Sequence, residues 1–447
     1  MIQVKRNLAK LLGERAIIIG GSIAGLLSAR VLADYFQQII IVDRDHFPKT
    51  PQARRGVPQS VQPHVLLTKG YRLLEEFFPG IAAELSDQGA LTIDWAQEFK
   101  HYVQGQWGIA TEEPSGIISV TCSRYLLEWT IRQELLKLPG IEIREQSKVA
   151  GLVYDQASNR VRGVELHNAA QIDADLVVDA SGRSSLASQW LQEIGQTPAP
   201  ETVINPFLGY ATRRYRLPDN FTPDWKVLLI SQTPPKDTRL GYLARIENDE
   251  IIATLGGYGK DFPPLDDRGF LDFASSLAQP DFYQAIANAT PSSPIYAHRA
   301  TANRMRNYDQ VKLPAGLIAI GDAVCALCPV YGQGMSVSAL GAKTLQGWLR
   351  QASPQKLDHN RFQKQLAKSN SLHWMLATSQ DSRFPSTVGA EESNQGTVAK
   401  LMAAYMNQLM DKSASKSSLH LTMLEVAHLL RSPLSLYHPA VIWQVLT

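Results

Sequence analysis

The first 45 residues contain the feature that most limits how this chain can fold. A short apolar run, Ala16–Ile19, leads into the glycine turn Gly20-Gly21-Ser22-Ile23-Ala24-Gly25, and a helical pattern of apolar residues follows over 26–32. A second apolar run, Ile39–Val42, ends at Asp43. Strand, glycine turn, helix, strand and acid, in this order, are the parts of a unit that binds dinucleotides.

Each part of this unit has a physical role. Gly20 permits the tight turn, and Gly25 lets the helix pack close to the strand. The first helical turn, with Ser22 and Ile23–Ala24, presents free N–H groups to a pyrophosphate. Asp43, 23 positions after Gly20, can accept hydrogen bonds from ribose hydroxyls. Ser22 replaces the expected second glycine but is small, so close approach of a pyrophosphate stays possible; the alternative is a tight turn without a ligand.

Two further glycine turns follow two further buried strands. The apolar run 176–178 leads into Asp179-Ala180-Ser181-Gly182. The run Gly316–Ile320 leads into Gly321-Asp322 and then the loop Pro329–Met335, before a helix that we expect over 336–350. A dehydrogenase that uses nicotinamide would normally show only the first of the three turns.

The pattern predicts an α/β fold with a discontinuous Rossmann-like domain formed by residues 1–200 and 300–350. Between them, residues 201–299 predict an inserted antiparallel-sheet domain for the substrate, with strands at 207–217, 226–232, 239–247 and 250–258. Residues 351–447 predict a helical C-terminal cap. The segment Glu247-Asn248-Asp249 is expected to be a hairpin turn.

Composition excludes several classes of protein. Of the 447 residues, 44% are hydrophobic and 19% charged, which is typical of a soluble enzyme and not of a disordered or fibrous chain. The formal net charge of +2 gives no reason to expect nucleic acid as a partner. No apolar run approaches the ~20 residues of a spanning helix, so we expect no integral membrane segment. Three cysteines cannot form a disulfide framework, which favours the cytoplasm.

Together, the three turns resemble those of the flavoprotein monooxygenases of the para-hydroxybenzoate hydroxylase group, and the resemblance spans nearly the whole chain. The segments most similar to one narrower branch are RRGVPQS, VVDASGRSS, GDAVCALCPVYGQGMS and SPLSLYHPAVIWQVL. That branch contains bacterial flavin epoxidases that act on polyene precursors of polyether antibiotics. The resemblance implies FAD as the cofactor of the Rossmann-like domain.

The resemblance also implies roles for individual residues. The first turn and Asp43 would hold the ADP moiety of FAD, and Arg124 would reach the pyrophosphate or the flavin. Asp322 would bind the ribityl chain, and the loop Pro329–Gly334 would lie against the isoalloxazine, where a helix N-terminus stabilises negative charge at N1 of reduced flavin. The implied cofactor-binding residues are Gly20, Ser22, Ile23, Ala24, Gly25, Asp43, Arg44, Arg55, Arg124, Asp179, Gly182, Gly321, Asp322, Pro329, Gly332, Gln333, Gly334 and Met335.

The implied activity is that of an FAD-dependent monooxygenase. It would insert one oxygen atom from O₂ through a flavin C4a-hydroperoxide, and it would epoxidise an alkene in an apolar organic substrate of specialised biosynthesis. Aromatic hydroxylation, halogenation and prenyl-chain reduction are alternatives on the same fold, although the WxWxIP signature of halogenases is absent. The flavin carries the chemistry, so no catalytic side chain is certain. His64 and Pro329 are the candidates nearest the flavin.

NAD(P)H is the implied electron donor. The segment Gly256-Gly257-Tyr258-Gly259 lacks a following helix and acid, so no second dinucleotide fold is evident. NAD(P)H would therefore bind transiently, or a partner flavin reductase would supply the electrons.

Several residues allow both a functional and a packing interpretation. Cys325 and Cys328 form a CxxC, which is either a redox dithiol or a pair of small packing residues; two thiolates do not complete a zinc site, so no metal is expected. His64 either contacts the flavin or fixes its loop. Arg54 and Arg55 are either solvated or bind the cofactor. Four aromatic side chains either line the substrate cavity or pack in the sheet: Phe207, Tyr210, Tyr215 and Tyr242.

Overall fold

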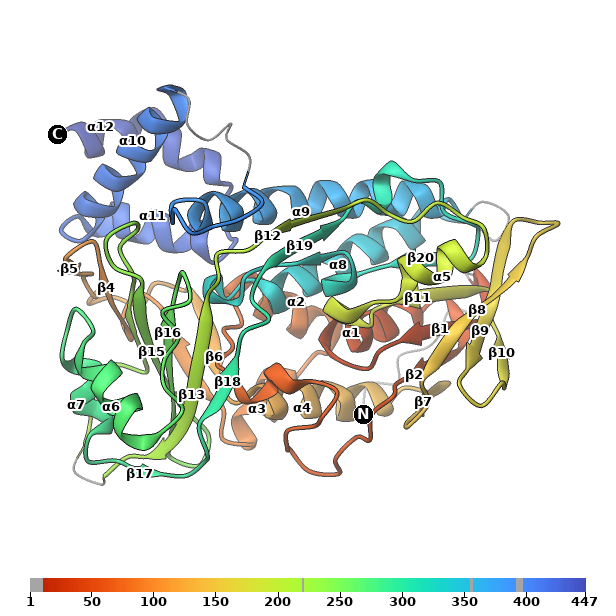
Figure 1. Ribbon diagram of the computed structural model, residues 1–447, viewed down its shortest axis with the longest axis horizontal. Helices are drawn as coiled ribbons and strands as arrows, with labels where there is room; N and C mark the ends of the chain where they lie inside the picture. The colour runs from red at the N-terminus through yellow and green to blue at the C-terminus, as the bar shows by residue number, and fades with distance from the viewer. Residues whose placement is uncertain (1–10, 219–220, 354–356, 391–396) are drawn as a thin grey trace.

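A parallel five-stranded sheet, in the order β20-β11-β1-β2-β7, forms the core of one half of the molecule, on the right in Figure 1. The computed structural model describes residues 11–218, 221–353, 357–390 and 397–447, so the first ten residues of the predicted range 1–200 lie outside it. The strands are β1 (Gly13–Ile19), β2 (Phe36–Val42), β7 (Ile141–Arg144), β11 (Leu176–Asp179) and β20 (Leu317–Ala319). The runs Ile17–Ile18 and Ile39–Ile41 are fully buried, as expected in a parallel sheet with both faces covered.

The strands of this sheet end level with one another. Ile19 pairs with Val42 on one side and with Asp179 on the other, and Asp179 pairs with Ala319. The three glycine turns therefore start from one edge of the sheet, where open α/β sheets bind ligands. This confirms the predicted Rossmann-like core.

Two glycines of the first turn are required by its geometry. Gly20 has φ +101°, a conformation that residues with a Cβ rarely adopt. A Cβ on Gly25 would lie 1.9 Å from the carbonyl oxygen of Gly20. Helix and strand can therefore approach this closely only with glycine at both positions.

Helices cover this sheet, and α8 packs against α1, α2 and α9. The predicted helix at 336–350 is α8, which begins two residues earlier, at Gly334. The helices of this part are α1 (Ile23–Leu32), α2 (Thr68–Phe77), α3 (Ile81–Asp87), α4 (Arg124–Leu136), α5 (Ala187–Glu193), α8 (Gly334–Arg350) and α9 (His359–Asp381). A sheet of β8 (Val149–Asp155), β9 (Arg160–Leu166) and β10 (Gln171–Asp173) lies beside them at one end of the molecule (Figure 1).

An eight-stranded sheet forms the second large unit (Figure 1). Its strands are β4 (Phe99–Val103), β5 (Gln106–Trp107), β13 (Gly209–Arg216), β14 (Val227–Ile230), β15 (Arg239–Ile246), β16 (Glu250–Gly257), β17 (Thr290–Pro291) and β18 (Tyr296–His298). All pairs are antiparallel except β14 with β4, which brings the segment 99–107 into the sheet. Helices α6 (Asp267–Ser275) and α7 (Asp281–Ile286) pack on one face. The predicted hairpin turn joins β15 to β16, with Asn248 and Asp249 at positive φ.

The remaining elements connect these units and form the C-terminal part. Two small sheets contain β12 (Glu201–Ile204), β19 (Asn303–Arg306) and β21 (Cys325–Ala326), and β3 (Leu91–Asp94) and β6 (Ile118–Thr121). The last helices are α10 (Thr397–Ser413), α11 (Ser417–Ala427) and α12 (Pro439–Leu446), grouped at the end of the molecule near β4 and β5 (Figure 1). Among the described helices, none combines the length and the apolar character needed to cross a membrane.

Candidate cofactor site

Asp43 lies at the carboxyl end of β2 and fixes the first glycine turn. Its Oδ2 accepts a hydrogen bond of 2.7 Å from the N–H of Gly21, and its Oδ1 accepts one of 2.9 Å from the N–H of Asp45. Oδ2 also lies 3.4 Å from Nη1 of Arg54. Since each carboxylate oxygen has two acceptor positions, Oδ1 keeps one free for a ligand hydroxyl.

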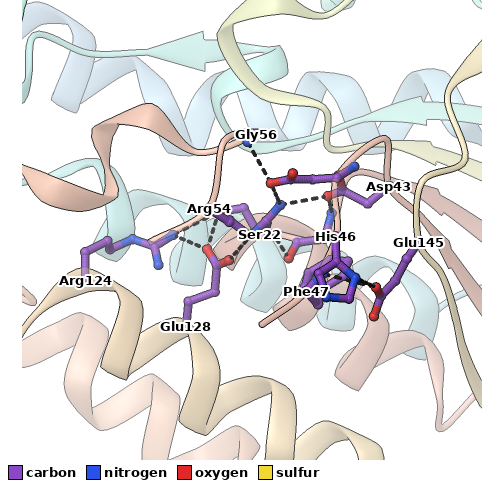
Figure 2. Close-up of polar contacts among 11 residues, drawn as sticks. Ser22, Asp43, His46, Phe47, Arg54, Gly56, Arg124, Glu128 and Glu145 are labelled. Carbon is purple, nitrogen blue, oxygen red and sulfur yellow. Dashed lines mark hydrogen bonds and ion pairs between the residues drawn. The ribbon is translucent and has the colours of Figure 1, made fainter. Parts of the chain in front are cut away.

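Arg54 connects the first turn to α4 (Figure 2). Its buried guanidinium lies 3.2 Å from Asp45 and 2.8 Å from Glu128, and its Nη2 donates to the carbonyl oxygen of Gly21 at 3.1 Å. Buried charges are stable only when they are paired and hydrogen-bonded, and these contacts meet that condition. We name the set formed by Asp43, Asp45, Arg54, Arg124 and Glu128 the Arg54 network.

Ser22 joins this network at the start of α1. Its hydroxyl donates to Oε2 of Glu128 at 2.7 Å and accepts from Nη2 of Arg124 at 2.9 Å. Burial alone would raise the pKa of Glu128, but the charges of Arg124 and Arg54 hold it below its usual value. Nη1 of Arg124 is buried and has no hydrogen-bond partner. A guanidinium with a free donor beside an uncapped helix N-terminus is suited to bind an anion.

The acidic residues of the second and third glycine turns, Asp179 and Asp322, differ in their hydrogen bonds and in their exposure. Oδ1 of Asp179 accepts from the N–H and the hydroxyl of Ser181, and Oδ2 accepts from the hydroxyl of Ser185 at 2.5 Å. Asp179 therefore fixes its own turn, in which Gly182 has φ +83°. Asp322 follows Gly321 and is 36% exposed, with Nε of Arg183 at 3.8 Å. Burial raises the pKa of Asp322, against the opposing charges of Arg183 and Arg124.

The N-terminus of α8 has free hydrogen-bonding groups and open space beside it. Gly332 has φ +63°, and Gln333 occupies the N-cap position without capping the helix by its side chain. Oε1 of Gln333 is buried without a partner. A Cβ built on Gly334 would meet no atom within 4 Å. Met335, the next residue, is buried and lines two small cavities beside α1 and α4.

His64 lies beside the same space and is fixed by its own loop. Its Nδ1 is 2.9 Å from the carbonyl oxygen of Gln62. Burial and the nearby charge of Arg124 lower the pKa of His64 to about 3, so the ring is neutral at physiological pH. Because a carbonyl oxygen only accepts, Nδ1 carries the proton of the neutral ring, and Nε2 remains as a hydrogen-bond acceptor. The cavity around it is lined by His64, Leu66, Val120, Cys122, Arg124, Leu127 and Met335.

The aromatic residues of the large sheet divide between its faces. Tyr215 packs with Phe270 in the core under α6, so it is a packing residue of the sheet. Tyr210 and Tyr242 share the opposite face with Thr212, whose hydroxyl donates to Oε1 of Gln62 at 2.5 Å. This face therefore contacts the loop that contains His64. Phe207 is half-buried outside the strands, where Lys260 lies 4.8 Å from its ring centre.

Four predicted site residues are exposed: Arg44, Arg55, Pro329 and Gly334. Arg54, next to the exposed Arg55, is buried.

Sequence reasoning missed several members of the site. Asp45 and Glu128 were not considered, although Glu128 stands four residues after Arg124, the spacing that brings two helical side chains together. Arg183 directly follows Gly182 of the second glycine turn, and the sequence pattern gives it no further role. It donates to the carbonyl oxygens of Ala302 and Leu327 as well as facing Asp322.

Cys325 and Cys328 are buried, and their thiols have low reactivity. Burial raises the pKa of Cys325 to about 12 and raises that of Cys328 well above its usual value. The thiolate is the reactive form, so neither residue is suited to exchange reactions. In the described part of the chain, no group of three or more His, Cys, Asp or Glu side chains could hold a metal ion.

We therefore expect the double variant Cys325→Ser, Cys328→Ser to keep FAD bound and to keep its rate of flavin reduction within a few-fold of the parent. Serine preserves the size and the hydrogen-bond donor of each thiol. Anaerobic reduction followed by flavin absorbance measures the rate. A fall of several orders of magnitude with FAD still bound would show that the dithiol takes part in electron transfer.

The residues present fit FAD. Unpartnered buried polar atoms, Nη1 of Arg124 and Oε1 of Gln333, come from α4 and from the start of α8. Two uncapped helix N-termini, of α1 and α8, follow strands or turns at one edge of the parallel sheet. The diphosphate of a dinucleotide requires donors such as Nη1 of Arg124 and the N–H groups of these two helix N-termini, and its rings require open space such as that beside Gly334.

Comparisons with known proteins agree with this fit. The FAD binding domain family matches residues 14–359. Protein Rv3254 of Mycobacterium tuberculosis is 30% identical over 356 residues, which cover 76% of this chain and 73% of that protein.

Solved structures share the fold at low sequence identity. The flavin-dependent brominase Bmp2 aligns with a TM-score of 0.64 at 12% identity, over 97% of this chain and 98% of that chain. The flavin-dependent halogenase CmlS aligns with 0.64 at 15% identity, over 93% and 77%. PqsL, described as a probable FAD-dependent monooxygenase from Pseudomonas aeruginosa, aligns with 0.59 at 15%, over 83% and 94%. The family match covers most of the chain, and the residues of the site fit FAD. This protein therefore belongs to the FAD binding domain family.

Proposed function

We propose that the protein is an FAD-dependent monooxygenase that inserts one oxygen atom from O₂ into an apolar organic substrate. One observation carries this proposal. The uncapped start of α1, the unpartnered Nη1 of Arg124 and the open start of α8 lie together at one edge of the parallel sheet. That arrangement suits an anionic dinucleotide such as FAD, and the large sheet contacts the loop that contains His64.

In this proposal each part of FAD meets one group of residues. The ADP moiety lies along the first turn, with the diphosphate at the start of α1 and Arg124, and a ribose hydroxyl at Oδ1 of Asp43. The ribityl chain meets Asp322, whose partly exposed carboxylate can accept hydroxyl hydrogen bonds. The isoalloxazine lies at the N-terminus of α8. The remaining contacts come from Ile23, Ala24, Gly182, Gly321 and the loop 329–335, with Arg44 and Arg55 at the rim. Asp179 acts indirectly, because it fixes the turn that contains Gly182.

The chain contributes positioning and exclusion of water. Bound FAD supplies electron storage and oxygen activation. Leu66, Leu127 and Met335 form an apolar wall beside the site, which keeps water from the reacting atoms. The N–H groups at the start of α8 favour negative charge that develops next to them. Neutral His64 can orient a polar group of the flavin or of the substrate without adding charge.

We propose an alkene as the substrate group and epoxidation as the reaction, on the resemblance of the motifs to flavin epoxidases. The face of the large sheet that bears Tyr210, Leu240 and Tyr242 would contact the substrate. NAD(P)H, either bound directly or used by a partner flavin reductase, would supply the electrons. Protein Rv3254, at 30% identity, carries no activity in its name and does not decide this point.

The experiment that tests the function supplies the FAD-loaded protein with NADH or NADPH, a flavin reductase, an apolar alkene and isotope-labelled oxygen gas. A product that carries one labelled oxygen atom supports the monooxygenase. A saturated product formed without oxygen would identify a prenyl-chain reductase. A product that requires bromide or chloride would identify a halogenase, and either result would overturn the proposal.

Asp43→Ala is expected to weaken FAD binding about tenfold, since one hydrogen bond to a charged group contributes about 1.5 kcal/mol. The protein should stay folded because Arg54 keeps Asp45 and Glu128 as partners. Titration of the apoprotein with FAD, followed by flavin fluorescence, measures the change. If the variant binds FAD as tightly as the parent, Asp43 does not contact the cofactor.

A further inference from the structure

A buried carboxylate outside the cofactor site collects hydrogen bonds from several separate elements. Asp381 is the last residue of α9 and is fully buried. Its Oδ1 accepts from the phenol of Tyr331 at 2.6 Å and from that of Tyr258 at 3.2 Å. Its Oδ2 accepts from Nδ2 of Asn303 at 2.6 Å.

One of these donors, Tyr331, lies in the loop that leads into α8, next to Gly332. Cys328 directly precedes this loop. The N–H of Cys328 donates to Oδ1 of Asn303 at 2.7 Å, so Asn303 links the start of the loop to Asp381 a second time. Tyr258, by contrast, follows β16 of the large sheet and stacks on Phe384 with ring centres 4.0 Å apart.

Burying a carboxylate in this way has a high desolvation cost if its only role is to fill space in the core. The ion pairs within the described residues leave out Asp381, so a buried carboxylate is held by neutral donors alone. Burial raises the pKa of Asp381, while the hydrogen bonds from Tyr331 and Asn303 oppose that rise. An apolar residue beside Tyr258 and Tyr331 would be buried at lower cost in desolvation. What the carboxylate adds is a fixed direction for the groups that donate to it.

We propose that Asp381 is a positioning residue that holds the segment 328–334, through Tyr331 directly and through Cys328 by way of Asn303, so that the N-terminus of α8 faces the flavin in one fixed orientation. The inference rests on the proposed placement of the isoalloxazine at α8. Asp381 does not touch the cofactor; it acts through the loop.

Two tyrosines that donate to the same oxygen provide a matched test. Tyr331→Phe removes the hydrogen bond that comes from the loop, and Tyr258→Phe removes the one that comes from the sheet. Both variants lose one phenol hydroxyl in a buried site, so a loss of stability alone would affect them alike. We expect Tyr331→Phe to raise the FAD dissociation constant about tenfold and to change the visible circular dichroism and midpoint potential of bound flavin. Tyr258→Phe should leave all three close to the parent.

A third variant, Asp381→Asn, removes the charge while nearly keeping the size. Its amide oxygen can still accept from both phenols, but its NH₂ group would face the donor Nδ2 of Asn303 and break the second link to the loop. It should therefore change the flavin in the same direction as Tyr331→Phe. The positioning role is wrong if Tyr331→Phe leaves the flavin unchanged, or if both tyrosine variants change it equally. A parent protein that binds no FAD would instead contradict the proposed function, so the two failures are distinct.

Discussion

Gly334→Val is expected to weaken FAD binding at least about a hundredfold while leaving the thermal stability of the protein nearly unchanged. The two effects separate because the protein itself has room for the new side chain: a Cβ at Gly334 meets no atom within 4 Å, and the backbone there is helical. Only an occupant of that space would oppose it. If the isoalloxazine lies there, the valine displaces it from the N–H groups of α8, and loss of one such donor commonly costs about 3 kcal/mol.

The chain offers a control on the same helix. Gly347 also has no atom within 4 Å of an added Cβ, and it lies 13 residues further along α8. Gly347→Val should therefore keep normal FAD binding and serve as the matched variant. FAD content after purification, FAD titration and thermal unfolding measure both proteins. Normal flavin binding by Gly334→Val would remove the start of α8 from the cofactor site.

Arg124→Ala is expected to reduce FAD affinity about thirtyfold to a hundredfold. Nη1 of Arg124 is buried without a partner, and a charge-assisted hydrogen bond to a phosphate oxygen contributes about 2 to 3 kcal/mol. The substitution also removes a partner of Glu128, which keeps its ion pair with Arg54 at 2.8 Å. The fold should therefore persist with a moderate loss of stability. FAD titration of the apoprotein measures the affinity.

Arg132 is the control for this effect. It lies two turns later on α4, is also buried, and donates to the carbonyl oxygen of Pro48 at 2.6 Å. Loss of Arg132 should lower stability as much as loss of Arg124, but it should leave FAD affinity within a few-fold of the parent. Equal losses of affinity in both variants would show that α4 acts on FAD only through the fold.

The parts of the fold that could be predicted are those in which local sequence determines the backbone. The turn at Gly20 needs a positive φ, and helix α1 has no room for a Cβ at Gly25, so the glycines at these two positions indicate the geometry. Runs of apolar residues mark strands that are buried on both faces. The hairpin at 247–249 was predictable because Asn and Asp tolerate the left-handed conformation that they adopt there.

The parts that could not be predicted depend on distant partners. Arg54 and Arg55 are adjacent and of one type, and the loop around them has no period that shows which points inward. The outcome depends on Glu128, 74 residues later, and on Asp45. Asp381 presents the same difficulty, since its partners lie 50 to 123 residues earlier in the chain. Nothing in a helical sequence shows that its last acid faces two phenols and an amide.

The most direct test of this account is the flavin content of the protein as purified and after incubation with added FAD. We expect a yellow protein with the absorption bands of oxidised flavin and one FAD per chain, which is released on denaturation. A folded protein that remains colourless after addition of FAD, and whose thermal stability FAD does not raise, would contradict the claim that the three turns at the edge of the parallel sheet form an FAD site.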